Sequence, residues 1–157
     1  MSFVLFAEQI LNGLQFGVML FLMAAGLTLI FGVMGLINLA HGSLFMIGGF
    51  VAAAIAGLTG SFMLALFGAL VASALAGALV ELFIMRHLYA KNHLDQVLAT
   101  FALILIFSEG TRWLFGSFPL FLDTPIYLSG PVDLFGGIKY PLYRLVLIAV
   151  GLLIAAG

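Results

Sequence analysis

Charged residues are scarce in this sequence. Only 7% of its 157 residues are Asp, Glu, Lys or Arg, whereas a soluble domain carries about a quarter. No residue of these four types falls between Glu8 and Glu81. A surface so poor in charge cannot be solvated by water over its whole area, so the composition excludes an ordinary soluble globular domain.

Several kinds of chemical site are also absent from the sequence. Cysteine does not occur, which excludes disulfides, thiolate metal sites and cysteine nucleophiles. Neither Lys91 nor Lys139 lies in a phosphate-binding G-x-x-x-x-G-K-[ST] loop, so we do not expect the chain to hydrolyse ATP. No carboxylate dyad, nucleophile–base pair or basic run for nucleic acid stands out. His41 has no second metal ligand three or four residues away. The sequence predicts no enzyme, no cofactor and no metal site.

Apolar residues are abundant instead. They make up 65% of the sequence, and the mean hydropathy is +1.34. A bilayer is spanned only by helices or closed barrels, and these apolar runs are continuous rather than alternating as barrel strands would be. The sequence therefore predicts an all-α, polytopic membrane helical bundle with about five spans. We expect these spans at about residues 8–31, 33–58, 62–85, 95–115 and 141–157.

The basic residues predict how the chain is oriented. The segment 86–94 carries Arg86 and Lys91 and should form a cytoplasmic loop by the positive-inside rule. The segment 116–140, which contains Asp123 and Asp133, should form an ordered loop on the opposite, periplasmic side. We expect residues 1–157 to form a single transmembrane domain with its first span retained, because no Lys or Arg precedes that span as it would in a signal peptide.

Small residues recur at helical spacing in two of the predicted spans. Gly13 and Gly17 form a G-x-x-x-G pair in the first span, and Ser73 and Gly77 belong to a small-residue stripe in the third. Such residues let helix backbones approach closely in a bilayer. We predict helix packing within one bundle for these four positions. Self-dimerisation through Gly13 and Gly17 is the alternative.

A polar interruption at residues 31–43 is the most informative feature of the sequence. It places Asn38, His41 and Ser43 among apolar residues and glycines, where polar side chains are costly and usually face a bundle interior or an aqueous path. If the segment is helical, Asn38 and Gly42 share a face. The glycines also permit a broken helix of the kind that transporters use at substrate sites. Two structural alternatives are a turn capped by Asn38 and His41, and hydrogen bonds from both to neighbouring helices.

The stretch from Gly26 to Gly49, GLTLIFGVMGLINLAHGSLFMIGG, resembles the signature region of permease subunits of branched-chain amino acid ABC transporters of the LivH/LivM type. Asn12-Gly13-Leu14 and the pattern from Glu81 through Arg86 to Lys91 are similar too. The resemblance implies an importer subunit for branched-chain or related hydrophobic amino acids in the bacterial inner membrane. It also implies a second permease subunit, two cytoplasmic ATPase subunits and a periplasmic substrate-binding protein as partners.

The resemblance further implies a discontinuous second transmembrane element, with Asn38, His41, Gly42 and Ser43 lining or shaping the translocation path. Members of that family are longer, and the cytoplasmic loop that docks onto the ATPase would follow the fifth span. We therefore expect this sequence to correspond to the N-terminal portion of such a permease. Two alternatives are a permease for urea or short amides and a non-transporting membrane scaffold.

Overall fold

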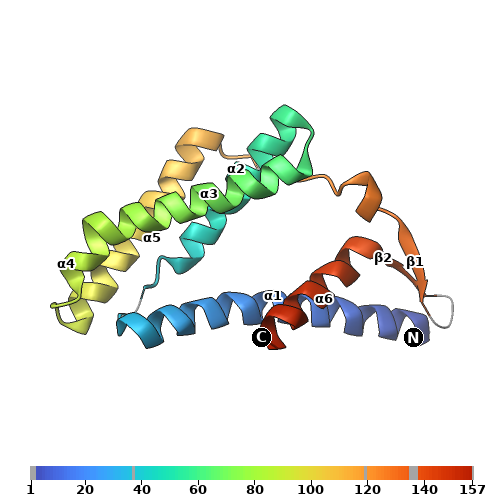
Figure 1. Ribbon diagram of the computed structural model, residues 1–157, viewed down its shortest axis with the longest axis horizontal. Coiled ribbons are helices and arrows are strands. Elements are labelled where there is room, and N and C mark those ends of the chain that lie inside the picture. The colour runs from blue at the N-terminus through green and yellow to red at the C-terminus, as the bar shows by residue number, and fades with distance from the viewer. Residues whose placement is uncertain (1–2, 37, 119, 135–137, 157) are drawn as a thin grey trace. The chain divides into compact units, whose positions relative to one another are not determined.

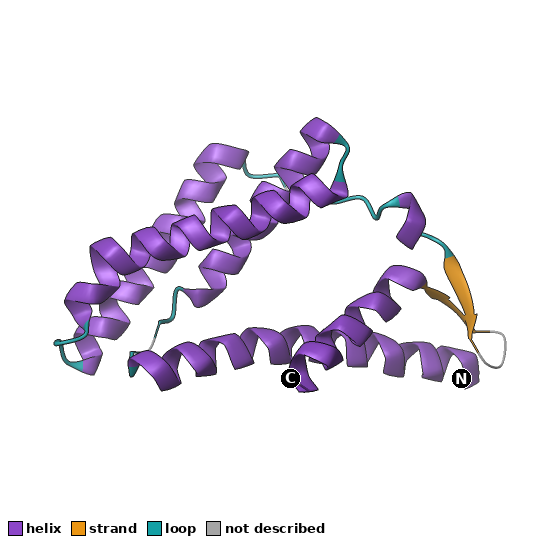
Figure 2. Cartoon of the chain, in the orientation of Figure 1, coloured by secondary structure: helices purple, strands orange, loops and turns teal. Residues whose placement is uncertain are grey.

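The computed structural model describes residues 3–36, 38–118, 120–134 and 138–156. The chain is mostly helical, and Figures 1 and 2 follow its course. The longer helices are α1 (Phe3–Met34), α2 (His41–Thr59), α3 (Phe62–Val80), α5 (His93–Phe115) and α6 (Leu142–Ala156). The shorter elements are the π-helical turn η1 (Glu81–Met85), α4 (Arg86–Leu88), the 3-10 turn η2 (Ile126–Leu128), β1 (Pro131–Leu134) and β2 (Ile138–Pro141).

The prediction of an all-α, polytopic membrane bundle is confirmed. Within the described residues, four helical segments are long and apolar enough to cross a bilayer: Phe3–Val33, His41–Thr59, Phe62–Leu88 and His93–Phe115. The third segment runs without a break from α3 through η1 into α4, so it includes the first residues of the predicted 86–94 loop. The predicted fifth span is α6, whose 15 residues fall short of the about 20 that a perpendicular crossing needs.

Local signals in the sequence determine where these helices begin and end. Gly60 takes a left-handed conformation, with φ +66°, at the end of α2, a conformation that glycine adopts without steric cost. The Ser61 hydroxyl then accepts a hydrogen bond from the Leu64 amide at 3.4 Å. Asn92 caps α5 in the same way, accepting from the Asp95 amide at 2.9 Å. These side chains satisfy amides that a helix N-terminus leaves unpaired.

The chain divides into two compact units. One comprises residues 1–26 and 123–157, and the other comprises residues 27–122. Each is described separately below. The expectation of a single transmembrane domain over residues 1–157 stays a prediction, as do the sides of the membrane assigned to the two loops.

In the unit of residues 27–122, α2 packs along α3 through small residues. A Cβ atom on Gly48 of α2 would collide with the Ser73 hydroxyl of α3. That hydroxyl donates a hydrogen bond to the Leu44 carbonyl at 3.2 Å, and a Cβ on Gly77 would lie 3.7 Å from the Leu44 side chain. Close approach of this kind stabilises helix pairs by van der Waals contact where lipid provides no hydrophobic drive.

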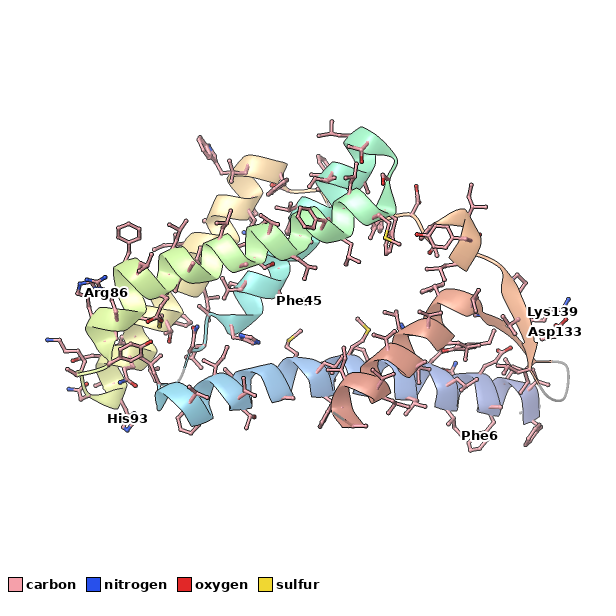
Figure 3. All side chains as sticks on the ribbon, in the orientation of Figure 1. Phe6, Phe45, Arg86, His93, Asp133 and Lys139 are labelled. Atoms are coloured by element: carbon pink, nitrogen blue, oxygen red, sulfur yellow. The ribbon has the colours of Figure 1, made fainter. Side chains whose placement is uncertain are left out.

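In the unit of residues 1–26 and 123–157, a β-hairpin precedes α6. Strands β1 and β2 pair antiparallel, with Asp133 opposite Lys139, and both side chains lie together at the hairpin in Figure 3. Helix α6 then packs against α1 at Gly151, where a Cβ atom would collide with Val18. The predicted 116–140 loop thus contains ordered structure, and α6 returns the chain to α1.

Replacing Gly48 by leucine should destabilise the α2–α3 pair. The added side chain has to displace Ser73, and overpacking of this kind typically costs about 1–3 kcal/mol. We expect Gly48→Leu to lower the free energy of unfolding in mixed micelles titrated with SDS and followed by circular dichroism. Gly49→Leu is the matched control, because a Cβ at Gly49 meets nothing within 4 Å. Equal losses in the two variants would contradict this packing.

Candidate functional site: the interrupted segment between α1 and α2

The interruption predicted within residues 31–43 lies between the first two helices. Helix α1 ends at Met34 and α2 begins at His41, and Ile37 lies outside the described residues. Gly35 has φ +64°, and its amide donates to the Phe31 carbonyl at 2.8 Å. Asn38 belongs to neither helix, so the helical face that would have joined it to Gly42 does not form. The break therefore precedes the second spanning helix instead of lying inside it.

Two apolar side chains anchor the break in the core of its unit. Leu36 is 2% exposed and Ala40 is 1% exposed. They form one cluster with Val80, Met85 and Leu103, which come from α3, the π-helical turn and α5. The non-helical backbone is thus packed against protein on several sides, the setting in which irregular backbone is tolerated at membrane depth.

Asn38 stabilises the break through its own side chain. It is 7% exposed, and its Oδ1 accepts a hydrogen bond from the Ala40 amide at 3.0 Å. Its carbonyl accepts from the His41 amide at 3.3 Å. The side-chain oxygen of Asn38 thus closes an Asx turn just ahead of the helix. Helix α2 itself has no side-chain cap, so Asn38 stabilises the turn and does not cap the helix.

His41 differs from Asn38 because its polar atom is not satisfied. The Nδ1 atom is shielded from the surface and has no hydrogen-bond partner among the residues that the structure describes. A buried polar atom without a partner costs about 1–3 kcal/mol, and such a cost often marks a functional position. The neighbouring Gly42 has open space where a Cβ would stand, and Ser43 is buried. The first turn of α2 therefore has an unsatisfied ring nitrogen on His41 and open space beside the backbone of Gly42.

Gln96 is a second buried polar residue in this unit, and the sequence analysis missed it. Its Nε2 donates to the Leu88 carbonyl at 3.1 Å and the Lys91 carbonyl at 3.2 Å. This ties the start of α5 to the preceding turn. Its Oε1 is buried without a partner within the described part of the chain. The signal was present in the sequence: Gln96, Thr100 and Leu103 are spaced to share one helical face, and all three are buried.

The other predicted site residues lie in separate places. Ser73 and Gly77 face α2 within the unit of residues 27–122, whereas Gly13 and Gly17 lie on α1 in the other unit. The packing roles of these four residues stay predictions, as does the path-lining role of Asn38, His41, Gly42 and Ser43. Over the described residues, no group of three or more His, Cys, Asp or Glu side chains could hold a metal ion.

Two acidic residues have local partners. Glu109 forms an ion pair with Arg112, with 3.5 Å between the charged atoms. The Glu81 Oε1 accepts a hydrogen bond from the Tyr89 hydroxyl at 2.6 Å. This bond spans the π-helical turn and α4, and π turns are often found at functional sites.

Comparison with known proteins identifies the family. The family model for the branched-chain amino acid transport system permease component matches residues 9–155. The chain belongs to this permease family. The family resemblance seen at residues 26–49 is thereby confirmed, and the family is one of transport permeases. No solved structure matches the chain.

Curated relatives of this permease match over a shorter stretch. The LivH permease proteins of Escherichia coli (strain K12) and Salmonella typhimurium, both named for high-affinity branched-chain amino acid transport, are 42% identical over 50 residues. This stretch is 32% of the present chain and 16% of each relative. The BraD permease protein of Pseudomonas aeruginosa is 43% identical over 47 residues, which are 30% of the chain and 15% of the relative. The matched stretch thus spans less than a fifth of these relatives.

Replacing Asn38 by leucine should destabilise the break between α1 and α2. The Ala40 amide would remain buried without its acceptor, at a cost of about 1–3 kcal/mol. The free energy of unfolding in SDS-containing micelles checks this. Gln15→Leu serves as the control and should change that energy by less than about 0.5 kcal/mol, because the Gln15 side chain forms one weak hydrogen bond, to the Met19 sulfur at 3.9 Å, within the described residues. An Asn38→Leu variant as stable as this control would refute the stabilising role of this turn.

The Tyr89 phenol should titrate well above its ordinary range. Burial, the hydrogen bond to Glu81 and the charge of Glu81 raise its pKa from 10.0 to about 12. Since the folded pKa is the higher one, its stabilising contribution is complete below pH 10 and is lost as the pH rises through about 12. Absorbance at 295 nm, taken as the difference between wild type and Tyr89→Phe, measures this step. Glu81→Gln should lower the pKa only partway, because burial is the largest cause. A step near pH 10 in the wild type would be inconsistent with the hydrogen bond.

Proposed function

We propose that this permease is a pore-forming subunit of an ABC importer, which moves branched-chain or related hydrophobic amino acids across the bacterial inner membrane. The match of the family model over residues 9–155 carries the proposal. The names of the LivH and BraD relatives support the substrate class. The sequence has no phosphate-binding loop, so the energy would come from ATP hydrolysis on a separate subunit.

The proposal assigns pore formation and ATP hydrolysis to different subunits, so it requires partners. A second permease subunit would complete the pore, two cytoplasmic ATPase subunits would drive it, and a periplasmic binding protein would deliver the substrate. The third spanning segment ends near Arg86 and Lys91, and this basic region supports a cytoplasmic position for the turn before α5.

The translocation path in this proposal passes the start of α2, and its four residues have different roles. Asn38 holds the backbone that borders the path and does not contact the solute, because its side-chain oxygen is already bonded to the Ala40 amide. His41 contributes the side chain with bonding capacity left over, since its Nδ1 lacks a partner within the described residues. Gly42 leaves room beside it, and Ser43 supplies a hydroxyl on the following position. A zwitterionic solute needs polar contacts of this kind to leave water at a tolerable cost.

Uptake of radiolabelled leucine tests this proposal. The chain is incorporated into vesicles with a second permease subunit, the ATPase subunits and a binding protein of this transporter class, and the initial rate is measured with ATP inside the vesicles. His41→Leu should lower the rate about tenfold or more, because one hydrogen bond to a charged solute contributes about 1.5–3 kcal/mol. His93→Leu is the matched control, since His93 is exposed at the start of α5 (Figure 3).

Three outcomes would contradict parts of the proposal. Unchanged uptake in the double variant Asn38→Leu/His41→Leu would exclude these residues from the path. Accumulation of urea or acetamide in place of leucine would overturn the substrate class. A complex that assembles but transports none of these solutes would favour a scaffold role.

A further inference from the structure

Arg144 is a cation placed in the first turn of the otherwise apolar helix α6. Its Nη1 donates a hydrogen bond to Asn12 Oδ1 at 2.5 Å, and its Nε contacts the Tyr143 hydroxyl at 2.8 Å. The Tyr140 hydroxyl donates to the same Asn12 oxygen at 3.0 Å. The guanidinium carbon also lies 5.9 Å and 5.6 Å from the ring centroids of Tyr140 and Tyr143. All four residues belong to one compact unit, so the guanidinium is held in place.

The charge of Arg144 is not compensated by a carboxylate. Across the described ranges the structure contains one ion pair, and it joins Glu109 to Arg112. Glu8, one turn before Asn12 on α1, makes no ion pair with Arg144. The first turn of a helix already has a positive potential, which a cation there reinforces. A partly buried guanidinium in this setting favours an oxyanion, which it can bind with two parallel hydrogen bonds.

An apolar groove lies between the same two helices, and its lining begins at Gly13, the residue after Asn12. It has a volume of about 380 Å³, within the range of small-molecule sites. Gly13, Gly17 and Phe21 of α1 line it together with Leu152 and Ala155 of α6. A Cβ at Gly13 or Gly17 would meet nothing within 4 Å, so both glycines widen the groove.

The cluster and the groove are neighbours on the same two helices, because Gly13 of the groove follows Asn12 in the chain. Asn12 contacts Arg144 and Val18 lies against Gly151, so α1 and α6 cross while both progress in the same direction. At roughly 1.5 Å per residue, the eight residues from Arg144 to Leu152 span about 12 Å. The site therefore has a cation at one end and an apolar channel of acyl-chain dimensions along the rest.

We propose that this site binds a phospholipid, with the lipid phosphate on Arg144 and one acyl chain in the groove between α1 and α6. Tyr140 and Tyr143 are residues typical of the membrane interface, where phosphates lie. The anionic headgroup of phosphatidylglycerol complements the single positive charge of Arg144. In phosphatidylcholine, the choline cation competes with Arg144 for the lipid phosphate. A free oxyanion shares the phosphate chemistry but leaves the groove unfilled.

Native mass spectrometry of the full chain in a nonionic detergent tests the site. Phosphatidylglycerol and phosphatidylcholine with identical acyl chains are titrated, and their apparent dissociation constants are compared. We expect wild type to bind phosphatidylglycerol about tenfold more tightly, the ratio that corresponds to one charge-assisted hydrogen bond. Arg144→Gln should remove this preference, and Arg144→Lys should restore part of it.

A groove variant and a charge control separate the two halves of the site. Gly17→Leu fills the groove and should weaken binding of both lipids while the headgroup preference stays. Arg112→Gln removes the same charge from an exposed ion pair and should leave both constants unchanged.

Three results would overturn the lipid site. The first is a preference for phosphatidylglycerol that survives Arg144→Gln. The second is complete displacement of the lipid by millimolar inorganic phosphate or leucine, which would make this a site for free anions. The third is a Gly17→Leu variant that binds lipid normally but no longer forms a dimer, which would make the groove an interface between two copies. None of these results depends on transport activity.

Discussion

An unpaired backbone amide in hydrocarbon costs several kcal/mol, and this cost determines how the chain can leave a helix near the bilayer. Between α1 and α2 the cost is met locally. The Gly35 amide bonds back to Phe31, and the Ala40 amide bonds to the Asn38 side chain. Burial of Leu36 and Ala40 then excludes lipid from the segment. The break is stable because the two hydrogen bonds and the burial of Leu36 and Ala40 occur together.

Close packing between helices also stabilises the protein in lipid. Lipid is as apolar as the side chains, so helices gain by fitting together and not by escaping water. In one unit Gly48 admits Ser73, and in the other Gly151 admits Val18. The Ser73 hydroxyl adds a hydrogen bond to the Leu44 carbonyl at a point where α2 has only just begun. Both units thus use a glycine where two helices lie closest.

Polar groups in this permease fall into two classes. Asn38 and Tyr140 are buried and hydrogen-bonded to their neighbours, so they stabilise the structure. His41, Gln96 and Arg144 each retain bonding capacity that the described chain does not use. Bonding capacity of this kind is costly in a membrane and is retained where a solute, a lipid or another subunit completes it. In the two proposals, the start of α2 is where a solute would act on this chain and the start of α6 is where a lipid would.

The sequence by itself determined the helices, the transport family and the position of the break. Long apolar runs become helices because a helix satisfies its own backbone hydrogen bonds within the segment, and glycine with polar residues at 31–43 marks where that pattern fails. Only the tertiary structure decided which polar groups are satisfied. The bonds of Asn12 to Tyr140 and Arg144 join residues 128 and 132 positions apart, and Glu81 accepts a bond from Tyr89 across the π-helical turn. These pairings depend on where separate helices meet, and no local pattern of residues encodes that distance.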